Sequence, residues 1–395
     1  MEDIIDKAKG VEERVIAIRR ELHENPELSG QEFETQKRIM RELDELGIPY
    51  RKVGTTSLIA TLKGGKPGNK TVALRADHDA LPIKEESGVA FSSKTDGLMH
   101  ACGHDAHTAM LLGAARILSE MKDEIQGEIR MFFQEGEETF SGARKIVEAG
   151  GMEGVDAAFG MHGMPAMAPG YASIMPGYRM AGADTIYVRF EGVSGHGSAP
   201  FKAKDTIHPA STFVLNLQAI VTKNIDPQEP VVLNVGKFSG GTKANIIAKF
   251  TQLDLTMRYF SPDARKIAHD GIRRHAQAIA DAFEIKAEVE IEESTISLYN
   301  DPELTRIAQK AFDKVAGEGH NVELQRQMGS EDMPYYFREA KGVYALMGYE
   351  NEDKGSIYFP HHEKFRIDED YMKYGVALHV QFALDFLNQT DQENV

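Results

Sequence analysis

The chain has 395 residues, of which 42% are hydrophobic, and a formal net charge of −16. This length exceeds one ordinary folding core, so two or three folding units are expected, and the hydrophobic content excludes a disordered chain. The acidic balance excludes nucleic acid and anionic membranes as expected partners, because both attract basic surfaces. We recognise no signal peptide and no apolar run of membrane length, and Cys102 is the single cysteine, so a cytoplasmic protein without an internal disulfide is expected.

Two helices are expected at the start of the chain, over residues 2–22 and 31–46, with a break at Pro26. Short apolar strands then alternate with helices. This alternation indicates an α/β layer with a largely parallel sheet. The strands are expected at 72–75, 129–133 and 155–161, and the helices at 106–121 and 141–149.

From about Asp184 the order changes to βαββαβ, which is typical of an open-faced α+β sandwich. Its elements are expected at 185–190, 205–222, 231–238, 245–258, 262–283 and 287–291, with the turn 239–242 joining the two middle strands. The α/β pattern resumes with a helix capped by Asp301, a strand at 343–347 and a closing helix at 368–387. The sequence therefore predicts a discontinuous α/β domain, 1–182 and 297–395, with a mostly parallel or mixed sheet. It is interrupted by an inserted α+β domain of ferredoxin-like order, 183–296.

The segment 99–107, MHACGHDAH, is dense in residues that bind transition metals. A lone cysteine is usually just a small buried apolar residue. Cys102 and His104, however, lie two positions apart in a glycine-containing turn, from which the backbone can aim both at one point. Thiolate and imidazole are ligands that suit zinc and its neighbours. The segment therefore predicts part of a metal site.

Further polar residues follow the predicted strands. Asp77 and Asp79 follow the first strand, Glu137 and Glu138 the next, and His162 a third. Ligands bind at the carboxyl edge of open α/β sheets, so these side chains are expected near one another. One glutamate can bind metal while the other accepts a proton from water, the division of labour that metal-assisted hydrolysis needs.

Several ordered stretches resemble the N-acyl-amino-acid amidohydrolases, including hippurate hydrolases and indole-acetyl-amino-acid hydrolases, within the aminoacylase and carboxypeptidase-G metallopeptidases. The resemblance covers nearly the whole chain. It is carried by residues 20–28 (RELHENPEL), 75–82 (RADHDALP), 99–105 (MHACGHD), 133–138 (FQEGEE), 195–196 (GH), 240–245 (GGTKAN), 329–332 (GSED) and His361.

The resemblance implies two divalent metal ions per subunit, Zn²⁺ or Mn²⁺, with Co²⁺ and Ni²⁺ as alternatives. It implies five metal ligands: Cys102, His104, Glu138, His162 and His361. It implies Glu137 as the general base, with Asp77, Asp79 and Asp105 supporting the ligands from behind. The inserted domain is expected to mediate a homodimer or homotetramer and to supply His196, from the partner, to polarise the scissile carbonyl. Asn245 and Arg258 match positions that hold the substrate carboxylate.

Some positions depart from the family pattern. Asp77 stands where the wider group has a ligand histidine, and Cys102 where it has a metal-bridging aspartate. Whether Cys102 bridges both ions or binds one stays open. Glu135 stands where the subfamily usually has a proline, and the bulky Phe140 stands where glycines usually follow the glutamate pair. The pocket is expected to change shape there. Glu363 replaces a proline in the last motif.

The expected function is therefore metal-dependent hydrolysis of N-acyl or N-aroyl amino acids to a carboxylic acid and an amino acid. A metal-bridged hydroxide attacks the amide carbonyl, with Glu137 as general base. The alternative is a dipeptidase or aminopeptidase with the same dinuclear site. A more remote alternative is a metal-dependent metabolite-binding protein without catalysis, which would have no need for the additional carboxylate of Glu137.

Overall fold

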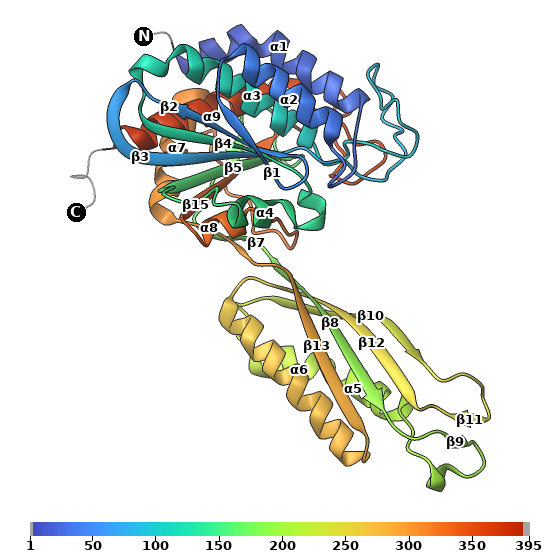
Figure 1. Ribbon diagram of the computed structural model, residues 1–395. Helices are drawn as coiled ribbons and strands as arrows, with labels where there is room; N and C mark the ends of the chain where they lie inside the picture. The colour runs from blue at the N-terminus through green and yellow to red at the C-terminus, as the bar shows by residue number, and fades with distance from the viewer. Residues whose placement is uncertain (1–2, 390–395) are drawn as a thin grey trace. The chain divides into compact units, whose positions relative to one another are not determined.

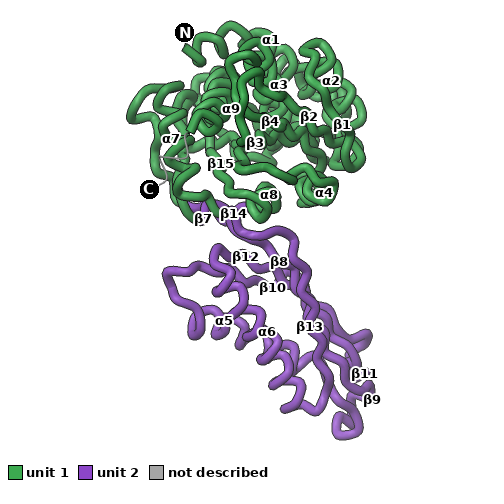
Figure 2. The backbone as a smooth tube through the Cα atoms, turned by 60° about the vertical axis from the view of Figure 1, so that its left-hand side comes forward, with its two compact units in different colours: residues 1–177, 299–325, 332–395 green, residues 178–298, 326–331 purple. Residues whose placement is uncertain are grey.

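The computed structural model describes residues 3–389, and the chain divides into two compact units (Figure 2). Unit 1 comprises residues 1–177, 299–325 and 332–395, and unit 2 comprises residues 178–298 and 326–331. The domain boundaries drawn from the sequence, 183 and 296, stay a prediction. In the structure the short segment 326–331 also belongs to unit 2.

Unit 1 is built on a seven-stranded mixed sheet with the strand order β1-β2-β4-β3-β5-β15-β6. The central strands β4, β3, β5 and β15 are parallel, and β1, β2 and β6 run antiparallel to their neighbours. The strand bounds are β1 Tyr50–Val53, β2 Ser57–Lys63, β3 Lys66–Asp77, β4 Gln126–Gln134, β5 Ala157–Met164, β6 Ala172–Ser173 and β15 Lys341–Gly348. The strands β5 and β15 and the second halves of β3 and β4 are largely buried, as expected for strands covered on both faces.

Helices cover the two faces of this sheet, with α3 and α9 against one face and α4 and α8 on the other (Figure 1). Helix α1 packs on α3 and α9, and α7 packs on α9. The bounds are α1 Ile4–Glu24, α2 Phe33–Glu45, α3 His104–Glu120, α4 Gly142–Glu148, α7 Pro302–Ala316, α8 Pro334–Phe337 and α9 Met372–Leu387. No helix within residues 3–389 is both long and apolar enough to cross a membrane.

Unit 2 contains a four-stranded antiparallel sheet with the order β10-β12-β8-β13. Two helices, α5 Ile207–Asn224 and α6 Pro262–Ala282, pack on it through a separate apolar core. The strands are β8 Gly182–Glu191, β10 Val231–Gly240, β12 Phe250–Tyr259 and β13 Lys286–Thr295. With two short strands, β9 Gly195–His196 and β11 Ile246–Ile247, paired beside it, this sheet has the βαββαβ order of a ferredoxin-like unit.

The predicted fold class is confirmed, but two local predictions are wrong and one pair of strands was not predicted. The pair β1 and β2 was not expected, because its alternation is short and interrupted by a turn. Residues 239–242 do not form a tight turn: β10 runs on to Gly240, and the chain forms β11 before β12 begins at Phe250. His162 lies inside β5 rather than after it, because pairing with β15 continues to Met164.

Glu135 fixes the β1–β2 turn to the end of β4. Its fully buried carboxylate accepts hydrogen bonds from the backbone N–H of Thr55 and Ser57 at 2.8 and 2.9 Å, and from Thr56 and Lys145. Burial alone would raise the pKa of Glu135, but these donors, Lys145 foremost, lower it to about 2. The side chain therefore anchors the β1–β2 turn to β4. The expectation that Glu135 and Phe140 change the shape of the pocket stays a prediction.

Because the folded-state pKa of Glu135 is depressed, its carboxylate stabilises the fold above the ordinary value of 4.5. That contribution is lost as the pH falls from 4.5 towards 2. We expect Glu135→Gln to lower the free energy of unfolding at pH 7 by about 2 kcal/mol, and to lower it less at pH 3. Urea unfolding at both pH values measures this. Glu128→Gln, which alters a partly exposed ion pair with Arg130 on the same strand, is the control and should change little.

Candidate metal centre

The turn before α3 places the first two candidate ligands. Gly103 precedes the helix with a φ of 89°, a left-handed conformation that favours glycine. This turn presents Cys102 just outside the helix and His104 as its first residue, both buried. The apolar face of α3 behind them is buried in the core of unit 1, so the turn has little freedom to move.

The two glutamates lie on a single 3₁₀ turn, Glu137–Thr139, three residues after β4. Gly136 and Phe140 bound this turn in left-handed conformations, with φ values of 58° and 51°. A bulky residue rarely adopts such a φ, and the conformation costs about 1–2 kcal/mol. Backbone strain of this kind persists where the surroundings fix the chain, as they do beside these carboxylates.

His162 and His361 complete the set. The ring of His162 donates from Nδ1 to the carbonyl of Gly163 at 2.8 Å, which turns Nε2 towards Cys102 Sγ at 3.3 Å. His361 also has a left-handed φ of 70°, and its backbone N–H donates to the carbonyl of Ala101 at 2.7 Å. Its Nε2 lies 3.2 Å from Glu138 Oε1.

The structure brings all five predicted ligands and Glu137 into one cluster, defined here as the metal centre. Their ligand atoms form three overlapping groups, each with all atoms within 4.8 Å: Cys102, His104 and His162; Cys102, Glu138 and His361; His104, Glu137 and Glu138. The members come from distant parts of unit 1 and meet only in the folded chain. Their individual roles stay predictions.

The chemistry of these residues fits divalent metal ions. Thiolate, imidazole and carboxylate together suit zinc and neighbouring transition metals. His104 Nε2 is fully buried and has no hydrogen-bond partner among residues 3–389, a situation that costs about 1–3 kcal/mol unless a ligand satisfies the nitrogen. Hydrogen bonds to Cys102 and Glu138 raise the pKa of His361 to about 10. The negative field that holds a proton on His361 also attracts a cation.

Asp79 orients His104 and the glutamate turn at once. Its Oδ1 lies 3.0 Å from His104 Nδ1, and its Oδ2 accepts the backbone N–H of Glu138 at 3.0 Å. Ser29 donates to the same Oδ2 at 2.7 Å. An imidazole held this way from Nδ1 presents Nε2 to a metal, as second partners of ligand histidines generally do.

Asp77 lies behind the ligands. Its Oδ2 accepts from Arg75 Nη1 at 2.7 Å, and its Oδ1 accepts from His107 Nδ1 at 2.7 Å. Both carboxylate oxygens of Asp77 thus accept hydrogen bonds from protein donors. This agrees with the sequence, in which Asp77 replaces the ligand histidine of the wider family pattern. The sequence reasoning assigned no role to Arg75 or His107. Arg75 stood in a family stretch, and His107 is at i+3 from His104 on the same helix.

Asp105 points away from the ligands towards α1. It lies 2.8 Å from both Arg19 Nε and His23 Nδ1, and His23 also contacts Glu85 at 3.1 Å. Although burial alone would raise the pKa of Asp105, Arg19 and His23 hold it well below its usual range. Asp105 therefore ties α1 to the first turn of α3, and the stretch 20–28 contributes to this contact through His23.

The remaining predicted site residues lie in unit 2. The exposed His196 pairs with Ile246 across β9 and β11, and Gly197 donates to the carbonyl of Asn245 at 2.9 Å, so His196 and Asn245 are close together. Arg258 is near the opposite end of β12, where burial lowers the pKa of its guanidinium. Within this unit the structure brings two of the three residues together and leaves Arg258 separate.

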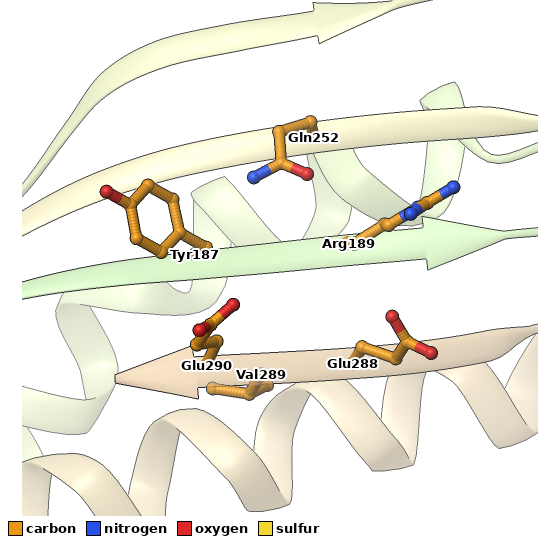
Figure 3. A pocket seen from close by; sticks show the side chains of 6 residues that line it. All are labelled: Tyr187, Arg189, Gln252, Glu288, Val289 and Glu290. Atoms are coloured by element: carbon orange, nitrogen blue, oxygen red, sulfur yellow. The ribbon is translucent and has the colours of Figure 1, made fainter. Parts of the chain in front are cut away.

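A shallow pocket of about 400 Å³ lies on the open face of the sheet of unit 2 (Figure 3). Tyr187 and Arg189 from β8, Gln252 from β12, and Glu288 and Glu290 from β13 line it. It contains none of the predicted site residues. Its side chains include no histidine or cysteine, so it lacks the soft ligands of the metal centre.

A cluster of cysteine, histidine and glutamate side chains at the carboxyl edge of a parallel sheet is typical of metal-dependent hydrolases. The model of peptidase family M20/M25/M40 matches residues 73–385. The chain belongs to this family. It is an amidohydrolase that depends on divalent metal ions.

Known relatives span almost the whole chain. It is 39% identical to thermostable carboxypeptidase 2 of Saccharolobus solfataricus, covering 98% of this chain and 100% of the relative. It is 37% identical to the N-acetyl-L-cysteine deacetylase of Bacillus subtilis, and the match covers 91% of this chain and 85% of the relative. The structure is also similar to the crystal structure of Bacillus subtilis YXEP protein, a dinuclear metal-binding peptidase of the M20 family. The TM-score is 0.85 at 33% identity, and the match covers 97% of this chain and 100% of the other.

We expect Asp79→Ala to weaken zinc binding by about 10–100-fold, because His104 loses the partner that orients it. Competition against a chelating indicator measures the affinity. Asp156→Ala is the matched control, since Asp156 accepts the backbone N–H of Thr71 at the opposite end of the same sheet. Equal affinities for Asp79→Ala and the control would show that Asp79 does not orient the ligand.

Proposed function

We propose that the protein hydrolyses N-acyl or N-aroyl amino acids to a carboxylic acid and an amino acid. The observation that carries the proposal is the placement of Glu137. Its carboxylate lies 4.0 Å from His104 Nε2, beside a cluster that already contains five candidate ligands without it. A binding site alone needs no such additional carboxylate, whereas amide hydrolysis needs a group that accepts and returns a proton.

We infer that Cys102, His104, Glu138, His162 and His361 hold two divalent ions, zinc or manganese first, with cobalt and nickel as alternatives. Such ions polarise an amide carbonyl and lower the pKa of water to about 7. Glu137 accepts a proton as water adds to the carbonyl carbon. It then delivers that proton to the nitrogen as the C–N bond breaks. Asp79 keeps His104 and the glutamate turn in place during both steps.

The wider family pattern has a histidine at position 77, whereas this chain has an aspartate, and this difference supports the proposed ligand set. The imidazole that the wider family pattern places at position 77 is absent here, and His104 supplies one from the next helix. Asp77 instead contacts both Arg75 and His107. Cys102 could bind one ion or bridge two. The sulfur of Cys102 lies 3.3 Å from His162 Nε2, so these two side chains can bind the same ion.

We expect Glu137→Ala to reduce kcat by at least about a thousandfold, because the proton acceptor is lost, while bound metal stays nearly unchanged. Elemental analysis and initial rates on an N-acyl amino acid measure the two quantities. Glu120→Ala, at the end of α3, is a surface control and should keep both. Retention of both activity and metal in Glu137→Ala would refute the base assignment.

A dipeptidase or aminopeptidase with the same site is the second candidate, favoured by the carboxypeptidase name of the relative from Saccharolobus solfataricus. N-acetyl and N-benzoyl amino acids should be compared with an unblocked dipeptide at equal metal loading. A blocked substrate preferred by kcat/KM supports the proposal. A preference for the free amine supports the peptidase.

We further propose that unit 2 mediates a homodimer, or a tetramer built from dimers, in the cytoplasm. Exposed apolar side chains gather in this unit: Leu215 on α5 is 84% exposed and Phe201 82% exposed. The edge strand β10 adds the exposed Val232 and Phe238. Large exposed apolar side chains beside an open strand edge are typical of protein–protein interfaces. His196 from the partner would then approach the substrate carbonyl.

We expect Leu215→Lys to shift the protein towards monomer, because a charge replaces apolar surface at the interface. Light scattering over a range of concentrations measures the mass. Ile267→Lys changes an exposed residue of α6 and serves as control. If partner His196 acts in catalysis, the monomeric variant should lose activity and retain metal. An unchanged mass would exclude this interface.

A further inference from the structure

The stretch 329–332, GSED, matched the family pattern but received no role. Its last residue, Asp332, is fully buried in unit 1. Three groups surround its carboxylate and donate four hydrogen bonds to it. Arg75 Nη2 donates to Oδ1 at 2.8 Å, Gln134 Nε2 donates to both oxygens at 2.9 and 2.8 Å, and the backbone N–H of Ala143 donates to Oδ2 at 3.0 Å.

Two of these contacts hold the ends of the loop that carries the glutamate pair. Gln134 is the last residue of β4, and Ala143 lies in the first turn of α4. Glu137 and Glu138 lie between them. A single carboxylate therefore joins the point where the loop begins to the point where it ends. Tyr336 supports the first contact, because its hydroxyl donates to Gln134 Oε1 at 2.9 Å.

The third contact leads to the histidine side of the metal centre. Arg75 donates to Asp332 and also to Asp77, whose other oxygen accepts from His107 Nδ1. His107 Nε2 then accepts the backbone N–H of Gly163 at 3.3 Å. Gly163 is next to His162 and receives the Nδ1 hydrogen bond of that ring. An unbroken series of contacts thus runs from Asp332 to a candidate ligand.

The first three of these groups, Asp332, Arg75 and Asp77, alternate in charge within the protein interior. They are each at most 1% exposed, and His107 is 2% exposed. Buried charges of this kind keep fixed positions, because moving one leaves another unpaired away from water. Asp332 therefore fixes two separate parts of the metal centre relative to each other.

We propose that Asp332 is a positioning residue that sets the glutamate turn and His162 in register with each other. The inference rests on the proposed function, in which both parts bind the same ions. Asp332 has a carboxylate oxygen within 4.8 Å of one of Glu137, and it is not among the five candidate ligands. It acts through Gln134 and Ala143 on one side, and through Arg75, Asp77 and His107 on the other.

The test is Asp332→Asn, which keeps the shape of the side chain and removes its charge. We expect zinc affinity to fall by about tenfold or more, as for other partners of metal ligands. The visible spectrum of the cobalt-substituted protein should change, because the ligand geometry changes. For hydrolysis, kcat should fall more than KM rises.

Glu42→Gln is the matched control. Glu42 is also buried and paired with arginines in unit 1, Arg14 and Arg38, but it lies on α2 and contacts none of these groups. It should lower stability and leave zinc affinity and the cobalt spectrum unchanged. Tyr336→Phe removes one hydroxyl from the same network and should shift zinc affinity in the same direction by a smaller factor. If Asp332→Asn does not fold, the zinc affinity of Tyr336→Phe tests the proposal instead.

The variant Asp77→Asn tests whether Asp332 acts through Arg75 and Asp77. If Asp332 acts through Arg75 and Asp77, the double variant should lose less affinity than the product of the two single losses. Lower thermal stability of Asp332→Asn with wild-type zinc affinity, cobalt spectrum and kcat would overturn the proposal. Zinc affinity and the cobalt spectrum do not depend on amide cleavage. If the wild type binds metal but cleaves no amide, the proposed function fails, while the metal measurements still decide the role of Asp332.

Discussion

Buried charge at the carboxyl edge of the seven-stranded sheet is the constraint on which the rest of unit 1 depends. Asp77, Asp79, Asp105 and Asp332 are all at most 1% exposed. A carboxylate in that position is tolerable only when donors surround it. Each of the four carboxylates has such donors. The four aspartates themselves lie in different parts of the chain: a strand, a loop, a helix and the segment after unit 2. The metal centre is held in place because its neighbours must satisfy these charges.

This constraint explains why the centre can include strained backbone. His361 and Phe140 both adopt left-handed φ values, and each lies at or within two residues of a candidate ligand. Strain of this kind would relax in a loosely held loop. Here the glutamate turn is anchored at both ends, and the His361 backbone is bonded to Ala101 next to Cys102. Rigid surroundings therefore present ligands in geometries that an isolated loop would not keep.

Much of this arrangement could be predicted from the sequence. The alternation of strands and helices indicated the fold class, and the order of unit 2 followed from periodicity and turns. The candidate ligands stood out because cysteine, histidine and paired glutamates followed strands that end at one sheet edge. The resemblance to a known family then connected His361, which no local pattern would have selected. Short strands such as β1 and β2 were missed because four to seven residues carry little periodicity.

Three groups behind the ligands, Arg75, His107 and Asp332, received no role for a different reason. They stand in stretches that the sequence singled out, but their roles lie in contacts between segments up to 257 positions apart. For Glu135, an unusual acid beside the glutamate pair suggested a change in the pocket, and the structure shows that its carboxylate binds the β1–β2 turn. Sequence patterns identify chemical groups well, but they do not say which way a side chain points.

Gly142 has a consequence for how this loop varies. A Cβ atom at this position would lie 1.6 Å from the carbonyl oxygen of Glu135, so no other residue fits without moving the backbone. The closing end of the glutamate loop is therefore fixed in both length and path. Residues 139–141, by contrast, are partly exposed or exposed, and here they read Thr-Phe-Ser where the family pattern has glycines. Natural divergence and directed evolution can thus alter the rim beside the metal centre at these three positions while the closing end of the glutamate loop stays the same.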